Sequence, residues 1–216
     1  MSRRQRAVEA IHAGGIIAIV RTKEADNIQA LMEALILGGV HALEITMTVP
    51  GAVELTRKLA RALPEDVVFG AGTVLDVSTA EQVMDAGARF VVAPVFRPEI
   101  IAACQRRDVA CLPGCLTPTE ILTAWEAGAD IVKVFPATAL GPRYLEDLRG
   151  PLPDLKLMPT GGVTLENTGA WIAAGAVAVG VGTQLIDPRV LAAGDFAALT
   201  ERARRFVQAV ATARAG

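Results

Sequence analysis

Gly128-Ala129-Asp130-Ile131-Val132-Lys133 is the stretch that decides the fold, because it is one copy of a pattern that recurs along the chain. In each copy a helical stretch ends at a glycine, and an apolar run typical of a buried strand follows. Glycine suits the end of a helix because positive φ carries no Cβ penalty there, and the run suits a strand buried on both faces. The other copies begin at Gly39, Gly87 and Gly175, so successive copies lie 48, 41 and 47 residues apart.

Each interval is long enough for two strand–helix units, so we expect a further strand within or before each one. The candidates are residues 15–21, 67–73, 109–112 and 155–160, with helices expected over 78–85 and 117–127 and an amphipathic closing helix over 191–215. Eight alternating strands and helices favour a closed parallel sheet. The sequence therefore predicts an α/β protein, with residues 1–216 forming a single (β/α)8 TIM barrel domain.

The composition excludes several classes of protein. The chain has 216 residues, 21 of them basic and 23 acidic, and it contains no basic run to follow a nucleic-acid backbone. No apolar stretch is long enough to span a membrane, and no signal-like segment follows the arginine-rich start, so we expect a cytoplasmic protein without nucleic-acid or membrane partners. The three cysteines, Cys104, Cys111 and Cys115, are expected to be reduced thiols.

Two charged residues fall on strands expected to be buried. In a TIM barrel the reacting groups come from the carboxyl ends of the strands, and side chains alternate between the two faces of a strand. Lys133 then shares the inward face with Ile131 and Phe135, while Glu44 and Arg21 point inward from their own strands. A buried charge is costly, so Lys133 and Glu44 form either a structural ion pair or a catalytic pair.

The catalytic interpretation makes Lys133 a nucleophile that forms an imine. Its apolar neighbours lower the pKa of the amine and so expose the neutral form, and Glu44 would move protons during the reaction. A second feature is a pair of glycine-rich segments, residues 159–163 and 180–183, after the last two strands. Glycines there let backbone N–H groups approach an anion, which predicts a phosphate site.

A metal site is not predicted. His12 and His41 are the only histidines and lie in different parts of the chain, and Cys111 and Cys115 have no further ligands near them in the sequence. We therefore expect neither a metal nor any other cofactor. Trp125 is expected to pack on a helix.

Several motifs in order resemble the 2-dehydro-3-deoxy-phosphogluconate and 4-hydroxy-2-oxoglutarate aldolase family, which includes the phosphogalactonate enzymes. The resemblance runs from about Gly15 to Asp187. The landmarks are Leu43-Glu44-Ile45-Thr46, Gly70-Ala71-Gly72-Thr73-Val74, Pro113-Gly114, Lys133-Val134-Phe135-Pro136 and Pro159-Thr160-Gly161-Gly162-Val163.

The resemblance implies a homotrimeric barrel that cleaves a phosphorylated 2-keto-3-deoxy sugar acid to pyruvate and an aldehyde, a reaction of the Entner–Doudoroff type. It implies a Schiff-base lysine at Lys133 and a proton-transferring glutamate at Glu44. The substrate contacts that we expect are Arg21, Thr73, Pro94, Phe135, Thr160, Gly161, Gly162, Gly182 and Thr183.

One position departs from the family pattern. Many members carry an arginine four residues after the glutamate, where it holds the substrate carboxylate, whereas this chain has Thr48. A hydroxyl cannot replace a bidentate guanidinium. Our hypothesis is that Arg21, at the end of the first strand, binds the carboxylate instead. The sugar stereochemistry and the preferred keto acid stay open.

Two other interpretations stay open. The chain could be another phosphate-binding barrel, such as an isomerase or synthase, which would share the glycine-rich segments without needing an imine at Lys133. It could also be a barrel that binds ligands without catalysis. The presence of both Lys133 and Glu44 disfavours this last interpretation, because a buried charge pair without a function can often be replaced by apolar residues.

Overall fold

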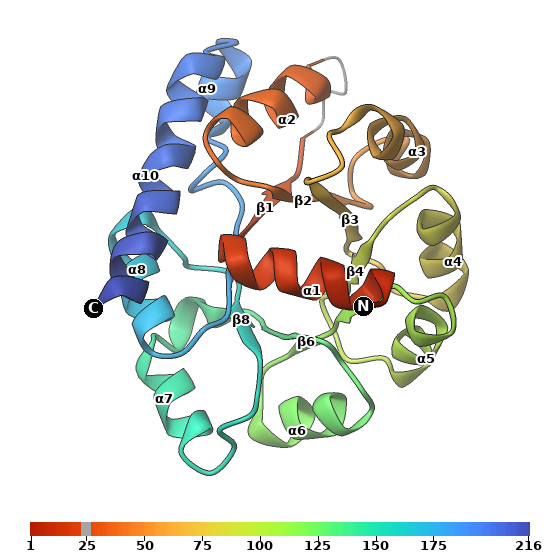
Figure 1. Ribbon diagram of the computed structural model, residues 1–216, viewed down its shortest axis with the longest axis vertical. Coiled ribbons are helices and arrows are strands. Elements are labelled where there is room, and N and C mark those ends of the chain that lie inside the picture. The colour runs from red at the N-terminus through yellow and green to blue at the C-terminus, as the bar shows by residue number, and fades with distance from the viewer. Residues whose placement is uncertain (23–26) are drawn as a thin grey trace.

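Strands alternate with helices along the chain in the computed structural model, which describes residues 1–22 and 27–216 (Figure 1). The strands are β1 (Ile16–Val20), β2 (Ala42–Thr46), β3 (Val68–Gly72), β4 (Phe90–Val92), β5 (Ala110–Leu112), β6 (Gly114–Cys115), β7 (Val132–Val134), β8 (Leu157–Pro159) and β9 (Val179–Val181). The helices are α1 (Arg3–Gly14), α2 (Ile28–Leu37), α3 (Ala52–Ala62), α4 (Val77–Asp85), α5 (Pro98–Arg106), α6 (Pro118–Glu126), the 3-10 helix η1 (Ala137–Ala139), α7 (Arg143–Arg149), α8 (Leu165–Ala173), α9 (Pro188–Ala192) and α10 (Phe196–Ala215).

All strand pairs are parallel, which confirms the α/β class. Six strands form one curled sheet in the order β5-β4-β3-β2-β1-β9, and three form a second in the order β6-β7-β8. An isolated parallel bridge between Thr160 and Gly180 joins the end of β8 to β9. At the other junction, Lys133 N donates to the carbonyl of Pro113, between β5 and β6, at 2.9 Å.

The expected strand positions all carry a strand, but the strand count was wrong in one place. We expected one strand over residues 109–112, and the described part of the chain has two short strands there, β5 and β6, on either side of Pro113. A proline has no N–H to give to a strand ladder, so the pairing changes sheet at this residue.

The residues of each strand divide between two apolar cores, as the alternation predicted. The inner core, enclosed by the strands, contains Ile17, Ile19 and Ile131, among others. The outer core, between the strands and the helices, contains Ile45 and Val132. Because Glu44 and Lys133 alternate with Ile45 and Val132, they belong to the inner face.

As expected, each of the four repeated glycines follows the end of a helix and has a positive φ. Gly39, Gly87, Gly128 and Gly175 have φ values of 88°, 107°, 90° and 97°. The predicted helices over 78–85 and 117–127 correspond to α4 and α6, and Trp125 packs against the outer core from α6.

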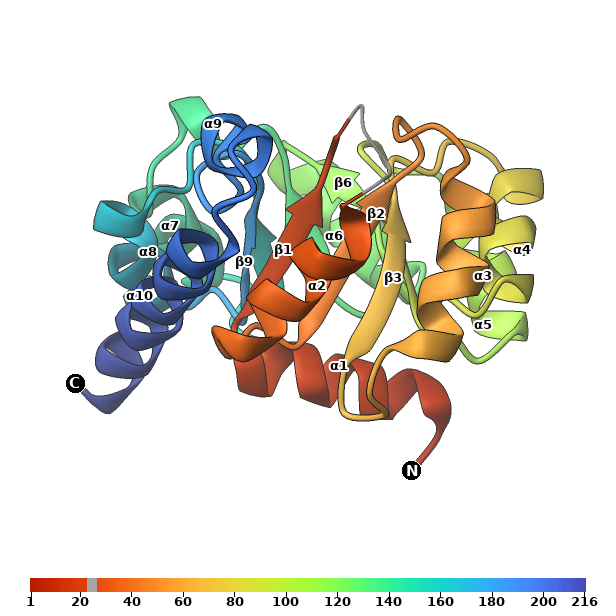
Figure 2. The same ribbon diagram turned by 90° about the horizontal axis from the view of Figure 1, so that it is seen from above.

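The N-terminal helix closes the end of the molecule where the strands begin (Figure 2). Ala7, Val8 and Ile11 of α1 pack into the inner core. Arg4 Nε donates to both carboxyl oxygens of Asp130, at 2.7 and 2.8 Å, and fastens α1 to the start of the β7 segment. No local pattern in the sequence had predicted that this helix covers the end of the sheet.

The C-terminal segment is not one continuous helix over 191–215. It forms α9 and α10, which are separated at Gly194, whose φ is 65°. Helix α10 packs between α2 and α8 on the outside of the sheet (Figure 1). Within residues 1–22 and 27–216, no helix has the length and hydropathy needed to cross a bilayer.

Candidate active site

Lys133 and Glu44 are the charged residues that the strands bury most deeply in the inner face. Lys133 lies at the middle of β7 and is 6% exposed, and Glu44 lies at the middle of β2 and is 1% exposed. Both residues are described in the structure, and no ion pair within 4.0 Å joins them. The structural ion pair that the sequence left open is therefore not formed.

Burial moves both groups toward their neutral forms. Desolvation lowers the pKa of the Lys133 amine, although the nearby Glu44 charge raises it and the Arg21 charge lowers it further. Desolvation raises the pKa of the Glu44 carboxyl, against the opposing charges of Lys133 and Arg21. A neutral amine is a nucleophile, and a carboxyl group whose pKa is closer to neutrality transfers protons in both directions more readily.

The Glu44 carboxyl group occupies space that a glycine leaves on the next strand. A Cβ atom at Gly72 would stand 1.7 Å from Glu44 Oε1. The other oxygen, Oε2, is buried and has no hydrogen-bond partner in the described part of the chain. A deeply buried, unsatisfied carboxyl oxygen beside a lysine is free to bond to a substrate or a water.

The Lys133 amine also faces an aromatic ring. Its Nζ lies 4.8 Å from the centroid of the Phe135 ring, two residues further along the chain on the same face. Phe135 is half-buried and borders the neighbouring cavity, so one ring contacts both the amine and the ligand space.

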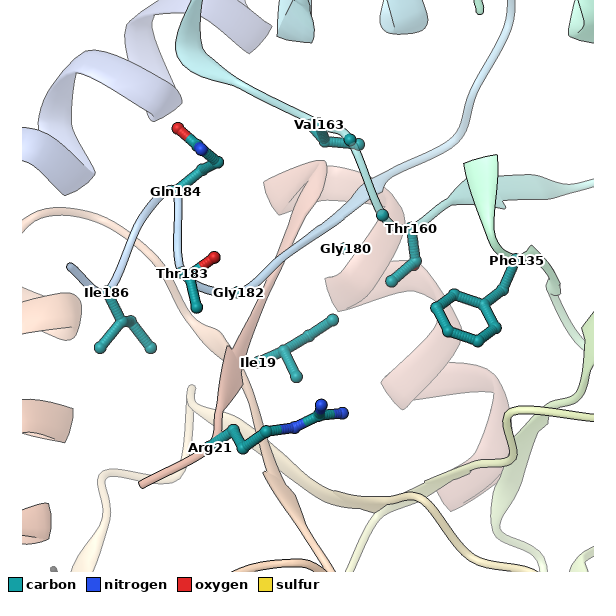
Figure 3. Close-up of a pocket in the computed structure, with 12 residues that line it drawn as sticks. Ile19, Arg21, Phe135, Thr160, Val163, Gly180, Gly182, Thr183, Gln184 and Ile186 are labelled. Carbon is teal, nitrogen blue, oxygen red and sulfur yellow. The ribbon is translucent and has the colours of Figure 1, made fainter. Parts of the chain in front are cut away.

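An open cavity of about 200 Å³ lies at the carboxyl ends of β1, β7, β8 and β9 (Figure 3). Phe135, whose ring faces the Lys133 amine, lines this cavity, whereas Lys133 and Glu44 are not among its lining residues. The cavity brings together most of the predicted substrate contacts. Those that line it are Arg21, Phe135, Thr160, Gly161, Gly162, Gly182 and Thr183. In Figure 3 the Arg21 side chain extends past Ile19 toward the side where Phe135 and Thr160 lie.

The two glycine-rich segments form part of the wall of the cavity that Arg21 also lines. Gly161 and Gly162 have φ values of 89° and 74°, and a Cβ at Gly162 would meet Thr138 Cα at 2.7 Å. The Thr160 hydroxyl is buried without a hydrogen-bond partner in the described chain, in space that Gly180 leaves open. These features make a small polar recess with room for an anion.

Two predicted contacts, Thr73 and Pro94, lie outside the residues that line this cavity. Both are half-buried and follow β3 and β4. Thr73 has a φ of 60°, a left-handed conformation that is uncommon for a threonine and that occurs often at functional sites. Thr48 is exposed, and its hydroxyl lies 2.7 Å from that of the buried Thr46.

Three cavity residues, Ile19, Gln184 and Ile186, were not predicted from the sequence. Val163 and Gly180 also line the cavity and belong to the two glycine-rich segments that were predicted to bind a phosphate. The alternation along β1 placed Ile19 on the inner face and could have identified it; no local signal marks Gln184, because it follows the glycine-rich segment as an ordinary loop residue.

Other side chains that could hold a metal do not gather in the described part of the chain. No group of three or more His, Cys, Asp or Glu residues is arranged there for metal binding. The three cysteines are free and buried, and burial raises the pKa of Cys115 to about 12, which keeps it as a thiol.

Comparison with known proteins gives one consistent result. The family model described as KDPG and KHG aldolase matches residues 8–202. A 2-dehydro-3-deoxy-phosphogluconate aldolase of Treponema pallidum is 35% identical over 203 residues, covering 94% of this chain and 96% of the relative.

Two solved structures match closely in fold. A structure described as native KDPGal has a TM-score of 0.87 at 32% identity, covering 93% of this chain and 96% of the other. A KDPG aldolase of Legionella pneumophila, with pyruvate captured as a covalent carbinolamine, has a TM-score of 0.85 at 28% identity and covers 92% and 96%.

Proposed function

The chain belongs to the KDPG and KHG aldolase family, and we propose that it acts as a class I aldolase in which Lys133 forms a Schiff base with a 2-keto acid. The observation that carries this assignment is the burial of Lys133 on the inner face, where it is 6% exposed, its Nζ lies 4.8 Å from the centroid of the Phe135 ring, and no ion pair within 4.0 Å joins it to a carboxylate in the described part of the chain. Burial also lowers the pKa of its amine. The Legionella relative holds pyruvate as a carbinolamine, the adduct that such an amine forms first.

In the proposed reaction, Lys133 Nζ attacks the keto carbon, and loss of water from the carbinolamine leaves a protonated imine. The imine withdraws electrons, so when the C4 hydroxyl gives up its proton the bond between C3 and C4 breaks and releases an aldehyde together with an enamine. Protonation at C3 and hydrolysis then release pyruvate and restore the amine. Glu44, whose raised pKa suits two-way proton transfer, moves these protons directly or through a water.

The cavity beside Lys133 suits the charged ends of a phosphorylated 2-keto-3-deoxy sugar acid. We assign the phosphate to the recess of Thr160, Gly161, Gly162, Gly182 and Thr183, and the carboxylate to Arg21. The influence of the Arg21 charge on the pKa values of both Lys133 and Glu44 supports a position close to the reacting carbon. Thr73, Pro94 and Phe135 are proposed to pack on the pyruvate end.

The substrate is proposed as a class rather than one compound. Relatives and solved structures are named for both the phosphogluconate and the phosphogalactonate acids. With Thr48 at the position of the usual arginine, the residues that orient the substrate differ from the common pattern, so either phosphorylated acid or 4-hydroxy-2-oxoglutarate fits the proposed chemistry.

We also propose that the two sheets close into a single (β/α)8 barrel, with β5 and β6 acting as one interrupted strand and residues 1–216 as one domain. The hydrogen bond from Lys133 N to the Pro113 carbonyl and the bridge between Thr160 and Gly180 support this closure. A homotrimer is proposed from the family resemblance. Leu75, Val95 and Leu116, which are exposed large apolar side chains after β3, β4 and β6, offer surface for such an assembly.

The experiment that tests the proposal is borohydride trapping with pyruvate followed by mass spectrometry. We expect the mass of one reduced pyruvate adduct, located at Lys133, and its loss in Lys133→Met. Lys156→Met, which removes an exposed lysine, is the matched control and should keep the adduct. An unmodified wild-type protein would favour an isomerase or synthase without an imine. A pyruvate-release screen over the three keto acids then identifies the substrate.

A further inference from the structure

A second cavity, of about 490 Å³, lies at the end of the molecule opposite the candidate active site. It is formed where the N-terminal turns of α1 approach the turn between α3 and β3 and the residue that precedes β4. Figure 2 shows α1 across the end of the sheet where the strands begin, whereas α9 and the loops of the active site lie at the other end. The substrate chemistry proposed above therefore does not involve this cavity.

Four arginines line the second cavity against a single carboxylate, that of Glu65. They are Arg3, Arg6, Arg61 and Arg89. No ion pair within 4.0 Å joins any of these four to a carboxylate in the part of the chain that the structure describes. The whole chain has a net charge of −2, so this concentration of positive charge is local rather than general.

Two of the guanidinium groups are held in place by backbone carbonyls. Arg89 Nη1 donates to the carbonyls of Glu65 and Val67, at 3.0 and 3.2 Å, and Arg6 Nη1 donates to that of Met1 at 2.8 Å. These bonds orient the groups, and neither guanidinium forms an ion pair within 4.0 Å with a described carboxylate. Asp108 accepts a hydrogen bond from the Arg3 backbone N–H at 2.7 Å, and hydrogen bonds first and then the Arg3 charge lower the pKa of the Asp108 carboxyl, so this carboxylate offsets part of the Arg3 charge.

We propose that this cavity binds a small organic phosphate or oligophosphate that carries at least two negative charges. Guanidinium groups bond phosphate oxygens in pairs, and several of them around one cavity bind multiply charged anions selectively. The volume exceeds that of the cavity beside Lys133, so the ligand has room for more than a single phosphoryl group. The ligand would contact α1, the turn before β3 and the start of β4 together. Its binding therefore links α1 to the strands and stabilises the folded chain.

The test is titration with pyrophosphate, followed by calorimetry, of the full chain and of matched variants. The variant Arg6→Gln/Arg61→Gln changes two exposed residues of the second cavity. The control Arg143→Gln/Arg204→Gln makes the same charge change on exposed residues of α7 and α10, each paired within its own helix.

We expect two pyrophosphate equivalents for the wild type and the control, one of them from the active-site recess. In the cavity variant the dissociation constant of one of the two sites should rise about tenfold, because each charge-assisted hydrogen bond to an exposed group contributes modestly to the binding free energy. The rise in melting temperature with pyrophosphate should fall in parallel. Equal affinities and stoichiometry in the cavity variant and the control would overturn the proposal, whatever the outcome at Lys133.

Discussion

The carboxyl group of Glu44 lies where the side chain of residue 72 would be, and only a glycine at that position leaves the space. A Cβ atom at Gly72 would stand 1.7 Å from Glu44 Oε1 and 2.4 Å from its Cδ. The two residues are on β2 and β3, which pair in parallel with Thr46 beside Gly72. The position of the proposed proton-transfer group therefore depends on a missing side chain on the neighbouring strand.

Gly72→Ala is expected to displace the Glu44 carboxyl group and to lower kcat/KM by about 100-fold, the lower range for loss of a general acid–base group. The backbone at Gly72 is not in the left-handed region, so the effect is steric. Pyruvate release and thermal unfolding should be measured together. The control is Gly169→Ala on α8, where a Cβ meets its nearest neighbour at an ordinary 3.7 Å. An active Gly72→Ala enzyme would show that the carboxyl position is unimportant.

The pH dependence of borohydride trapping should shift in opposite directions in two variants. Burial lowers the pKa of Lys133, so trapping in the wild type should rise with a midpoint below that of an exposed lysine. The Glu44 charge raises this pKa, and Glu44→Gln should move the midpoint to lower pH. The Arg21 charge lowers it, and Arg21→Met should move the midpoint to higher pH. Shifts in the same direction would contradict the electrostatic arrangement.

Arg21→Met is expected to raise the KM for keto-acid substrates about tenfold or more, because it removes the proposed charge-assisted bond to the substrate carboxylate. Thr48→Arg added to this variant should recover part of the affinity. Thr48 is exposed and borders, together with Arg21, a cavity of about 470 Å³, so an arginine side chain has room there. Steady-state kinetics of the single and the double variant with each phosphorylated acid measures both changes in KM. An unchanged KM in Arg21→Met would assign the carboxylate to another residue.

Asp130→Ala is expected to reduce the free energy of unfolding by about 2–4 kcal/mol, because it leaves a half-buried arginine unpaired. Asp130 accepts from Arg4 Nε and from the Cys111 backbone N–H, at 2.7 and 2.9 Å, and its side chain is only 12% exposed. Asp147→Ala removes an exposed partner of Arg143 and should leave the melting temperature nearly unchanged. Chemical denaturation of the two variants gives the comparison, and equal losses would show that the link from α1 to β7 is not stabilising.

Local patterns predicted much of the inner face. Alternation along β7 and β2 was enough to predict that Lys133 and Glu44 point inward, because neighbouring residues of a strand face opposite sides. The glycine at each helix end was equally predictable, since its positive φ is a local requirement. The break at Pro113 could have been read from the proline itself, but its effect on sheet pairing depends on neighbours distant in the sequence.

The sequence by itself determined the order of strands and helices, the glycines between them and the side of each strand on which the reactive groups lie, because these properties need only neighbours within a few residues. Tertiary structure alone decided that Gly72 makes room for Glu44, that Arg21 and Gly162 line one cavity, and that four arginines meet at the opposite end. Each of these depends on how the curled sheet brings together residues from distant parts of the chain, and so do the burial and charge that set the pKa of Lys133.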